Sequence, residues 1–191
     1  MVEATGPLIV GIGGTTKPGS STEQALAVAL AAARAIGART HLVGGLELAR
    51  LPIYAPENPD RSPEQRALVD LVRQADGLVV ATPAYHGGVS GLIKNAIDLL
   101  EDLRDDSRPY LHNRAVGIII TAFGWQGSGT TLISVRTIVH ALRGWPTPLG
   151  VTLNTAEKLF DGDGNCTDAR AAQTLGMLGS QVMEFARRFA A

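Results

Sequence analysis

The chain is short of the residues that crosslink a fold or bind metals. Its 191 residues include one cysteine, Cys166, and four histidines. A single cysteine can neither form a disulfide within the chain nor supply a cysteine metal cluster. Three of the histidines, His41, His112 and His140, do not cluster in the sequence, so we expect no metal site. This use of cysteine is typical of a cytoplasmic protein.

Long apolar runs and an excess of one charge are also missing. No run approaches the roughly 20 apolar residues that a membrane-spanning helix needs. The first residues, MVEATGPLIVGIGG, show no charged region followed by an apolar one, so we expect no signal peptide. The formal net charge is −1, which gives no broad basic field to attract nucleic acid. These absences favour a cytoplasmic protein that binds neither membranes nor nucleic acids.

The chain does contain a regular alternation of apolar strands and amphipathic helices. Strands are expected at residues 7–13, 39–45, 77–82, 115–121 and 148–153. Helical spacing of apolar residues follows them at 22–37, 62–77, 92–103, 132–142 and 175–189, while residues 46–60, with three prolines, predict a surface loop. Such an alternation predicts a doubly wound parallel sheet with helices on both faces. No repeat or linker interrupts it, so residues 1–191 are expected to form one domain.

The loop after the first strand, GGTTKPGSST, is polar throughout. Ligands of a doubly wound sheet bind at the carboxyl ends of its strands, where this loop lies. It matches neither the dinucleotide fingerprint nor a Walker A loop. It offers a cation, free N–H groups at a helix start and several hydroxyls, which suit one terminal phosphate. These residues are Thr15, Lys17, Ser20, Ser21 and Thr22. The alternative is a plain helix cap after a polar turn.

The loops after the third and fourth strands, TPAYHGG and TAFGWQGSG, combine aromatic rings with glycine. Gly87 and Gly88 expose backbone N–H groups beside the flat side chains of Tyr85 and His86. A planar heterocycle fits against such a surface. The alternatives are a tight turn with solvent-facing rings, and an indole, that of Trp125, packed over the sheet end. Together with the phosphate-like first loop, both loops suggest a mononucleotide with an aromatic base.

Three stretches carry a resemblance to a known family: GTTKPGSSTEQAL, LPIY and ATPAYHGGVSGLIKNAIDLL. They are similar to the NADPH-dependent FMN reductases of the flavodoxin-like fold, and the likeness extends from Leu8 to about Phe189. The resemblance implies a five-stranded parallel sheet with the order 2-1-3-4-5. It also implies a homodimer or homotetramer, to which the helix carrying Gly91, Lys94, Asn95 and Asp98 contributes. We interpret those four residues as structural, with Gly91 allowing close approach at the helix start.

The same resemblance assigns the cofactor contacts. The first loop would hold the FMN phosphate through Thr15, Lys17, Ser20, Ser21 and Thr22. The isoalloxazine would lie against two further loops, whose contributing residues are Pro83, Ala84, Tyr85, His86, Gly87 and Gly88 after the third strand, and Thr121, Phe123, Gly124 and Trp125 after the fourth. His86 is the one candidate for a catalytic side chain, as a proton donor, and the alternative for it is a polar wall.

The resemblance implies an enzyme that transfers a hydride from NADPH or NADH to flavin. The leading hypothesis is an FMN reductase that supplies reduced flavin to a flavin-dependent monooxygenase. A second is a reductase with fixed FMN whose acceptor is a small molecule such as a quinone, an azo dye or a metal ion. A third is a flavin-binding electron carrier that does not use nicotinamide, although true flavodoxins are usually strongly acidic. A fourth is an interaction module that has lost its flavin.

Overall fold

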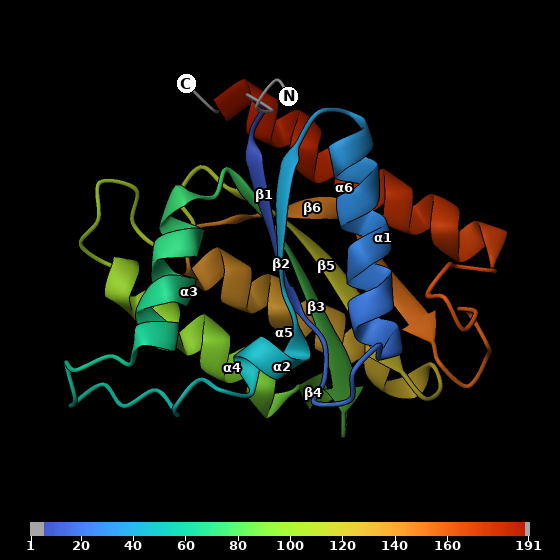
Figure 1. Ribbon diagram of the computed structural model, residues 1–191, viewed down its shortest axis with the longest axis horizontal. Coiled ribbons are helices and arrows are strands. Elements are labelled where there is room, and N and C mark those ends of the chain that lie inside the picture. Colours follow the sequence, from blue (N-terminus) through green and yellow to red (C-terminus); the bar gives the residue numbers. More distant parts are fainter. Residues whose placement is uncertain (1–5, 190–191) are drawn as a thin grey trace.

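The computed structural model describes residues 6–189. Residues 1–5 and 190–191 lie outside the described residues. The first five belong to the segment in which the sequence predicts no signal peptide. Five parallel strands form the sheet in the order β2 (Arg39–Val43), β1 (Leu8–Gly13), β3 (Gly77–Tyr85), β5 (Ala115–Ala122) and β6 (Trp145–Asn154) (Figure 1). Since β5 and β6 are the fourth and fifth parallel strands, the expected order 2-1-3-4-5 is confirmed.

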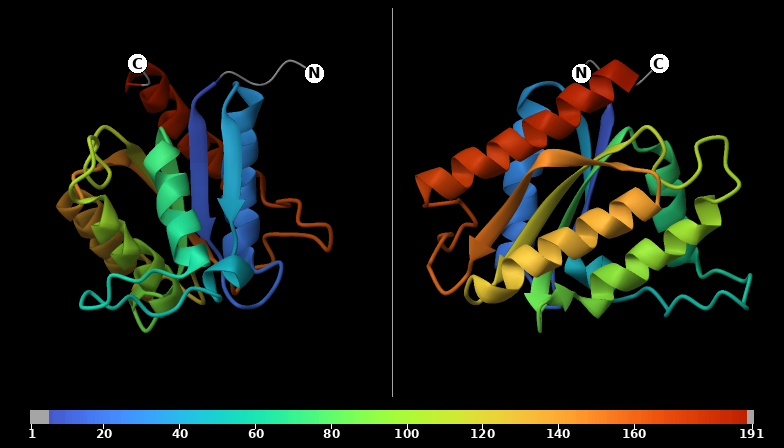
Figure 2. Two further views of the ribbon diagram at one scale, coloured as in Figure 1. Left: turned by 60° about the vertical axis from the view of Figure 1, so that its left-hand side comes forward. Right: turned by 180° about the vertical axis from the view of Figure 1, so that it is seen from behind.

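Helices cover both faces of this sheet (Figure 2). One face packs against α1 (Ser21–Ala35) and α6 (Ala169–Phe189), and the other against α3 (Pro63–Gln74), α4 (Gly91–Asp98) and α5 (Gln126–Ala141). Every position of β1 is buried. Its side chains alternate between the two cores, with Val10 and Ile12 on the α3 side and Ile9 on the α1 side. The continuous apolar runs therefore reflect strands that are buried on both faces.

Local signals set several of the helix ends. Ser62 accepts a hydrogen bond from the Gln65 backbone N–H, and the Gln65 side chain accepts one from the Ser62 N–H, at 3.2 and 2.8 Å. This reciprocal capping box begins α3 at Pro63, as its sequence predicts. Lys94 and Asp98, four positions apart on α4, form an ion pair at 2.7 Å. Within residues 6–189, no helix is long and apolar enough to cross a membrane.

Several expected boundaries are wrong. The strand expected at 148–153 begins at Trp145, and the helix expected at 175–189 begins at Ala169. The third strand continues to Tyr85 because it pairs with the added two-residue strand β4 (Gly88–Val89). The expected strand 39–45 ends at Val43, and the short helix α2 (Gly45–Leu48) follows, so the start of the expected surface loop is helical. Residues 126–129 open α5 rather than forming a loop, and the helix after β3 tightens into a 3₁₀ turn, η1 (Leu99–Leu103).

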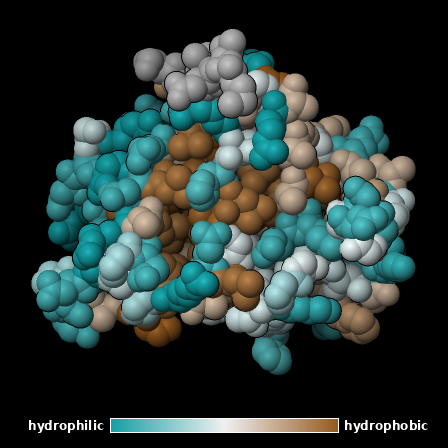
Figure 3. Space-filling view, in the orientation of Figure 1, coloured by the Kyte–Doolittle hydropathy of each residue, from teal (hydrophilic) through white to brown (hydrophobic). Residues whose placement is uncertain are grey.

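One edge of the sheet carries apolar surface. Figure 3 shows it in the middle of the face seen in Figure 1, beside β2 between α3 and α1. A groove of about 440 Å³ lies there, and its apolar floor includes Val43, Leu51, Leu68 and Leu71. This groove shares no residue with the cleft described next.

Candidate functional site

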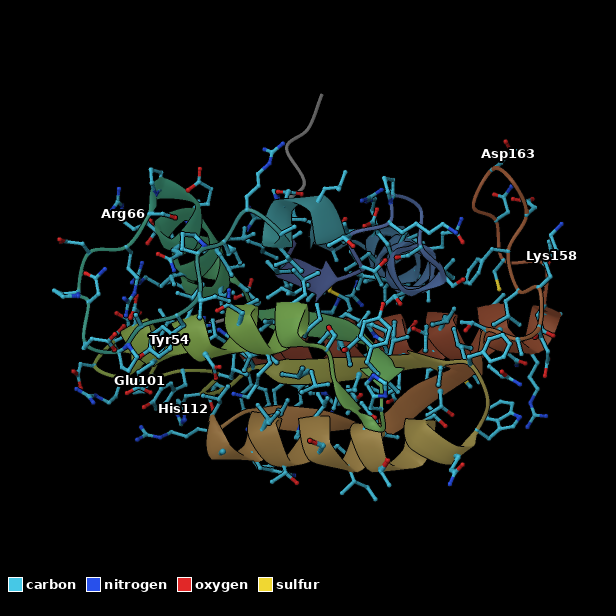
Figure 4. The ribbon with its side chains drawn as sticks, turned by 90° about the horizontal axis from the view of Figure 1, so that it is seen from below. Tyr54, Arg66, Glu101, His112, Lys158 and Asp163 are labelled. Carbon is cyan, nitrogen blue, oxygen red and sulfur yellow. The ribbon has the colours of Figure 1, made fainter. Side chains whose placement is uncertain are left out.

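A cleft of about 920 Å³ opens at the carboxyl ends of the strands, the end seen in Figure 4. Three chain segments line it: the β1–α1 loop, the β3–β4 hairpin and the β5–α5 loop. Nearly all the site residues predicted from the sequence meet here, namely Thr15, Lys17, Ser20, Ser21, Thr22, Pro83, Ala84, Tyr85, His86, Gly87, Thr121, Phe123, Gly124 and Trp125. Gly88 does not line the cleft, and it pairs with Tyr85 across the hairpin.

The N-terminus of α1 forms one end of the cleft. Ser20 caps this helix by accepting the Glu23 N–H at 3.3 Å. The first N–H groups of a helix have no partner within it, and the helix dipole makes this end favourable for an anion. Lys17 lies exposed in the preceding turn, where its N–H donates to the Thr15 hydroxyl at 3.2 Å. The Lys17 cation, the loop hydroxyls and the N-terminus of α1 therefore lie at the same end of the cleft, as a phosphate-binding site requires.

Thr22 lines the cleft and also makes a contact that its sequence does not predict. Its hydroxyl is buried and lies 2.6 Å from the hydroxyl of Thr121 at the end of β5. The two threonines are 99 positions apart in the sequence and hydrogen-bond to each other inside the fold. This hydrogen bond joins the end of the β1–α1 loop, which we call the phosphate loop, to the β5–α5 loop, the third segment of the cleft.

A neighbouring segment that the sequence analysis passed over supports the phosphate loop. Gly45, at the start of α2, packs so closely on this loop that a Cβ there would lie 1.8 Å from the Thr15 carbonyl oxygen. The Gly45 N–H also donates to the Glu23 carboxylate at 3.1 Å. The available signal was the Gly44–Gly45 pair at the carboxyl end of the second strand.

The hairpin beside the cleft turns in two residues. His86 and Gly87 have φ values of +52° and +78°, and they connect the paired residues Tyr85 and Gly88. Two positive φ values in a two-residue loop define a type I′ turn, which favours Asn-Gly over His-Gly. A non-glycine residue in this region costs roughly 1 kcal/mol or more. Other non-glycine residues of the described chain share this conformation, so the strain alone assigns no role to the imidazole.

We expect His86→Asn to keep the turn and lose the imidazole. Asparagine tolerates positive φ, so the melting temperature should stay at the wild-type value. If the imidazole takes part in turnover, the rate of NADPH oxidation should fall about tenfold, a modest value for a positioned proton donor. His86→Ala should lower both quantities, because alanine strains the turn. An unchanged rate in His86→Asn would leave His86 as a polar wall.

The third cleft segment is fixed through its backbone and leaves its rings free. Ala122 O accepts from the Thr155 N–H at 2.8 Å, and the Gly124 N–H donates to the Asn154 side chain at 2.9 Å. Phe123 and Trp125, by contrast, are 88% and 61% exposed. Asn154 and Thr155 at the end of β6 were missed from the sequence, since only the fold brings them to this loop.

The hairpin and the β5–α5 loop are held at a set spacing. A Cβ on Gly127 would lie 3.2 Å from the Gly87 Cα, so the turn packs directly on the first turn of α5. The Thr130 hydroxyl spans the same contact by donating to the Gly87 carbonyl at 3.3 Å. Gly127 and Thr130 line the cleft, and neither was predicted.

The cleft fits a flavin mononucleotide in size and chemistry. Its volume lies within the roughly 300–1,000 Å³ of typical ligand pockets. One end supplies a cation and a helix start, and the rim supplies the exposed rings of Tyr85, Phe123 and Trp125. Among the described residues, no group of three or more His, Cys, Asp or Glu side chains is placed to hold a metal ion. Fold and cleft together define a mononucleotide-binding protein of the flavodoxin-like class.

The chain belongs to the NADPH-dependent FMN reductase family, whose model matches residues 7–158. An NADPH azoreductase of Bacillus sp. is 35% identical over 92 residues, which is 48% of each chain. An FMN-dependent NADPH-azoreductase of Staphylococcus haemolyticus is 31% identical over 116 residues, covering 60% of this chain and 58% of the relative. The chain thus matches about half the length of these curated relatives. The family name gives NADPH as the reductant and FMN as the flavin that is reduced.

Solved structures with low sequence identity share the fold. FerB, a flavoenzyme NAD(P)H:(acceptor) oxidoreductase from Paracoccus denitrificans, superposes with a TM-score of 0.78 at 19% identity and covers 96% of this chain and 98% of its own. At these identities the likeness concerns the fold alone, and it extends over nearly the whole chain.

Lys17→Ala should weaken FMN binding about five- to tenfold and riboflavin binding hardly at all. The lysine is the cation of the candidate phosphate site, and riboflavin lacks the phosphate. Fluorescence titration of both flavins measures the difference, with Lys158→Ala, an exposed lysine outside the cleft lining, as the matched control. An equal loss for both flavins would contradict the phosphate assignment.

Proposed function

We propose that this protein is an NADPH-dependent FMN reductase that passes its electrons to a planar small-molecule acceptor in the same cleft. The observation that carries the proposal is the continuity of the cleft, from the cation and helix start at one end to the open aromatic rim at the other. The names of the azoreductases similar to this chain support an azo compound or a quinone as the acceptor class.

Bound FMN would supply the chemistry, since it accepts a hydride from nicotinamide and gives two electrons to an acceptor. The side chains bind and orient. In this proposal Lys17 and the start of α1 hold the phosphate, while Thr22 and Thr121 fix the loops on which it rests. Tyr85 and Trp125 form flat walls, and His86 donates a proton to the acceptor from an imidazole nitrogen.

A second candidate function is the supply of reduced FMN to a monooxygenase. One observation favours it: Lys17, the cation that lines the cleft, is an exposed lysine without the bidentate fork of arginine. Such a site releases flavin more readily than one built on a buried arginine. The two functions differ in whether flavin leaves the protein between turnovers.

One experiment separates the two functions. NADPH oxidation is followed under argon, first with catalytic FMN and an azo dye or quinone, then with increasing free FMN alone. The proposed function predicts fast oxidation with the acceptor, and oxidation that stops after one equivalent of bound flavin without it. Oxidation that scales with free FMN would favour the supply of reduced flavin. No oxidation under either condition would contradict both functions.

We also propose that the chain forms a homodimer through the face that carries α4. There the side chain of Ile53 is 81% exposed, on a segment held to α4 by the Tyr54 N–H bond to Asn95 at 2.8 Å. A Cβ at Gly91 would meet no atom within 4 Å, so the expected close approach is absent within the chain. Light scattering tests the mass, and Ile53→Asp should shift it towards the monomer.

A further inference from the structure

A second cavity adjoins the candidate flavin cleft. It has a volume of about 430 Å³ and follows β6 to the start of α6, and Trp125 lines both spaces. The edge of β6 faces outward here between α5 and α6 (Figure 2, right). The loop after β6, marked by Lys158 in Figure 4, lies at the same side of the molecule. We call this cavity the β6 groove.

One charged side chain of the β6 groove, a cation, has no hydrogen-bond or ion-pair partner among the described residues. Asp168 accepts the Ala171 N–H at 2.6 Å as the cap of α6, and Glu157 accepts the Asn154 side-chain N–H at 3.3 Å. Within residues 6–189, the Arg170 guanidinium makes no ion pair and no hydrogen bond. Arg170 is thus the one cation among the residues that line the groove, and the carboxylates of Asp168 and Glu157 keep their negative charges beside it.

The proposed hydride donor needs more room than the nicotinamide ring takes. When nicotinamide lies on the flavin, the adenosine half of the dinucleotide must extend to neighbouring surface. Two further cavities share residues with the cleft: the β6 groove, and a space of about 110 Å³ beside Tyr85. The smaller one lies well below the roughly 300 Å³ at which ligand pockets begin.

We propose that the β6 groove binds the adenosine 2′-phosphate end of NADPH. Trp125 offers an exposed aromatic face for the adenine, and Arg170 offers a cation for the 2′-phosphate. Glu157 lines the same groove and opposes a phosphate. The inference rests on the proposed function, and it gives the protein a preference for NADPH over NADH.

Two substitutions should shift the preference in opposite directions. Arg170→Ala should lower the ratio of kcat/KM for NADPH to that for NADH about fivefold, the size expected for one exposed charge pair. Glu157→Gln should raise the same ratio, because it removes a repelling charge. Arg188→Ala, at the other end of α6, is the matched control and should leave the ratio unchanged. A ratio that neither groove variant moves would overturn the proposal.

A binding experiment tests the groove without turnover. The FMN-loaded protein is titrated by calorimetry with adenosine 2′,5′-bisphosphate and with 5′-AMP. We expect tighter binding of the bisphosphate, a preference lost in Arg170→Ala, and weaker binding of both ligands in Trp125→Ala but not in Trp145→Phe. Equal binding of the two ligands by the wild type would overturn the groove assignment. If the protein oxidises neither NADPH nor NADH, the proposed function is contradicted. The titration still tests whether the β6 groove binds the adenosine 2′-phosphate, because it does not depend on turnover.

Discussion

Gly45→Ala should lower the affinity for FMN at least tenfold while affecting riboflavin less. The new Cβ would lie 1.8 Å from the carbonyl oxygen of Thr15, a backbone atom that cannot rotate away. The phosphate loop must then move by more than 1 Å relative to α2. A displaced loop loses charge-assisted hydrogen bonds to the phosphate, each of which is worth about 1.5–3 kcal/mol. Flavin fluorescence titration measures both affinities.

The same variant should unfold at a lower temperature, since overpacking costs about 1–3 kcal/mol. Gly129→Ala is the matched control: it lies in α5, where a Cβ meets no atom within 4 Å, and the helix should gain slightly from alanine. A Gly45→Ala protein that binds FMN as tightly as the wild type would show that the phosphate does not rest on the β1–α1 loop.

Gly45 illustrates which part of the site a sequence can reveal. The loops after the first, third and fourth parallel strands were predicted because hydroxyls, rings and glycines gather at carboxyl ends of apolar strands. That reasoning needs only the element order, which apolar runs such as 115–121 make plain. Gly45 contributes only the absence of a side chain. Its importance comes from contact with Thr15, thirty positions earlier, and the Gly44–Gly45 pair marks the position without indicating this partner.

The same limit explains the other residues that were missed or misread. Thr22 looked like a free hydroxyl because its partner, Thr121, is far away in the sequence. Asn154 reaches the third cleft segment only through strand pairing of β5 with β6. The stretch after the third strand predicts a loop or a tight turn and does not indicate the paired hairpin, since His-Gly is a weaker turn signal than Asn-Gly. The sequence of a single segment predicts which residues lie in a loop of the site. The contacts between two segments become known only once the fold places them side by side.

Arg114→Met should lower the free energy of unfolding by about 3 kcal/mol and the melting temperature by about 10 °C. Arg114 is 0% exposed, and its guanidinium donates to the carbonyl oxygens of Ala75, Tyr110 and Arg73 at 2.9, 2.6 and 2.9 Å. Methionine fills part of the space but donates nothing. Ala75 keeps a donor in Arg108, so the Tyr110 and Arg73 carbonyls lose the bond that Arg114 supplies.

Burial, together with the Arg108 charge, lowers the pKa of Arg114 to about 10, and the side chain stays charged at neutral pH. Because the folded state holds this proton less tightly than the unfolded state, the stability attributable to Arg114 changes with pH, upwards, only near and above pH 10. The effect of the substitution should therefore be constant between about pH 6 and pH 9. Thermal unfolding at several pH values within that range checks this.

Arg104→Met, which removes an arginine with surface ion pairs to Glu101 and Asp105, is the control and should barely change the melting temperature. Arg114 precedes β5, at the opposite end of the sheet from the cleft. Arg114→Met should accordingly lower stability without changing FMN affinity, the reverse of Lys17→Ala. A loss of FMN affinity in Arg114→Met, at temperatures where the variant remains folded, would mean that the amino ends of the strands influence the cleft. The residues that stabilise the sheet at one end and those that bind FMN at the other would then not act independently.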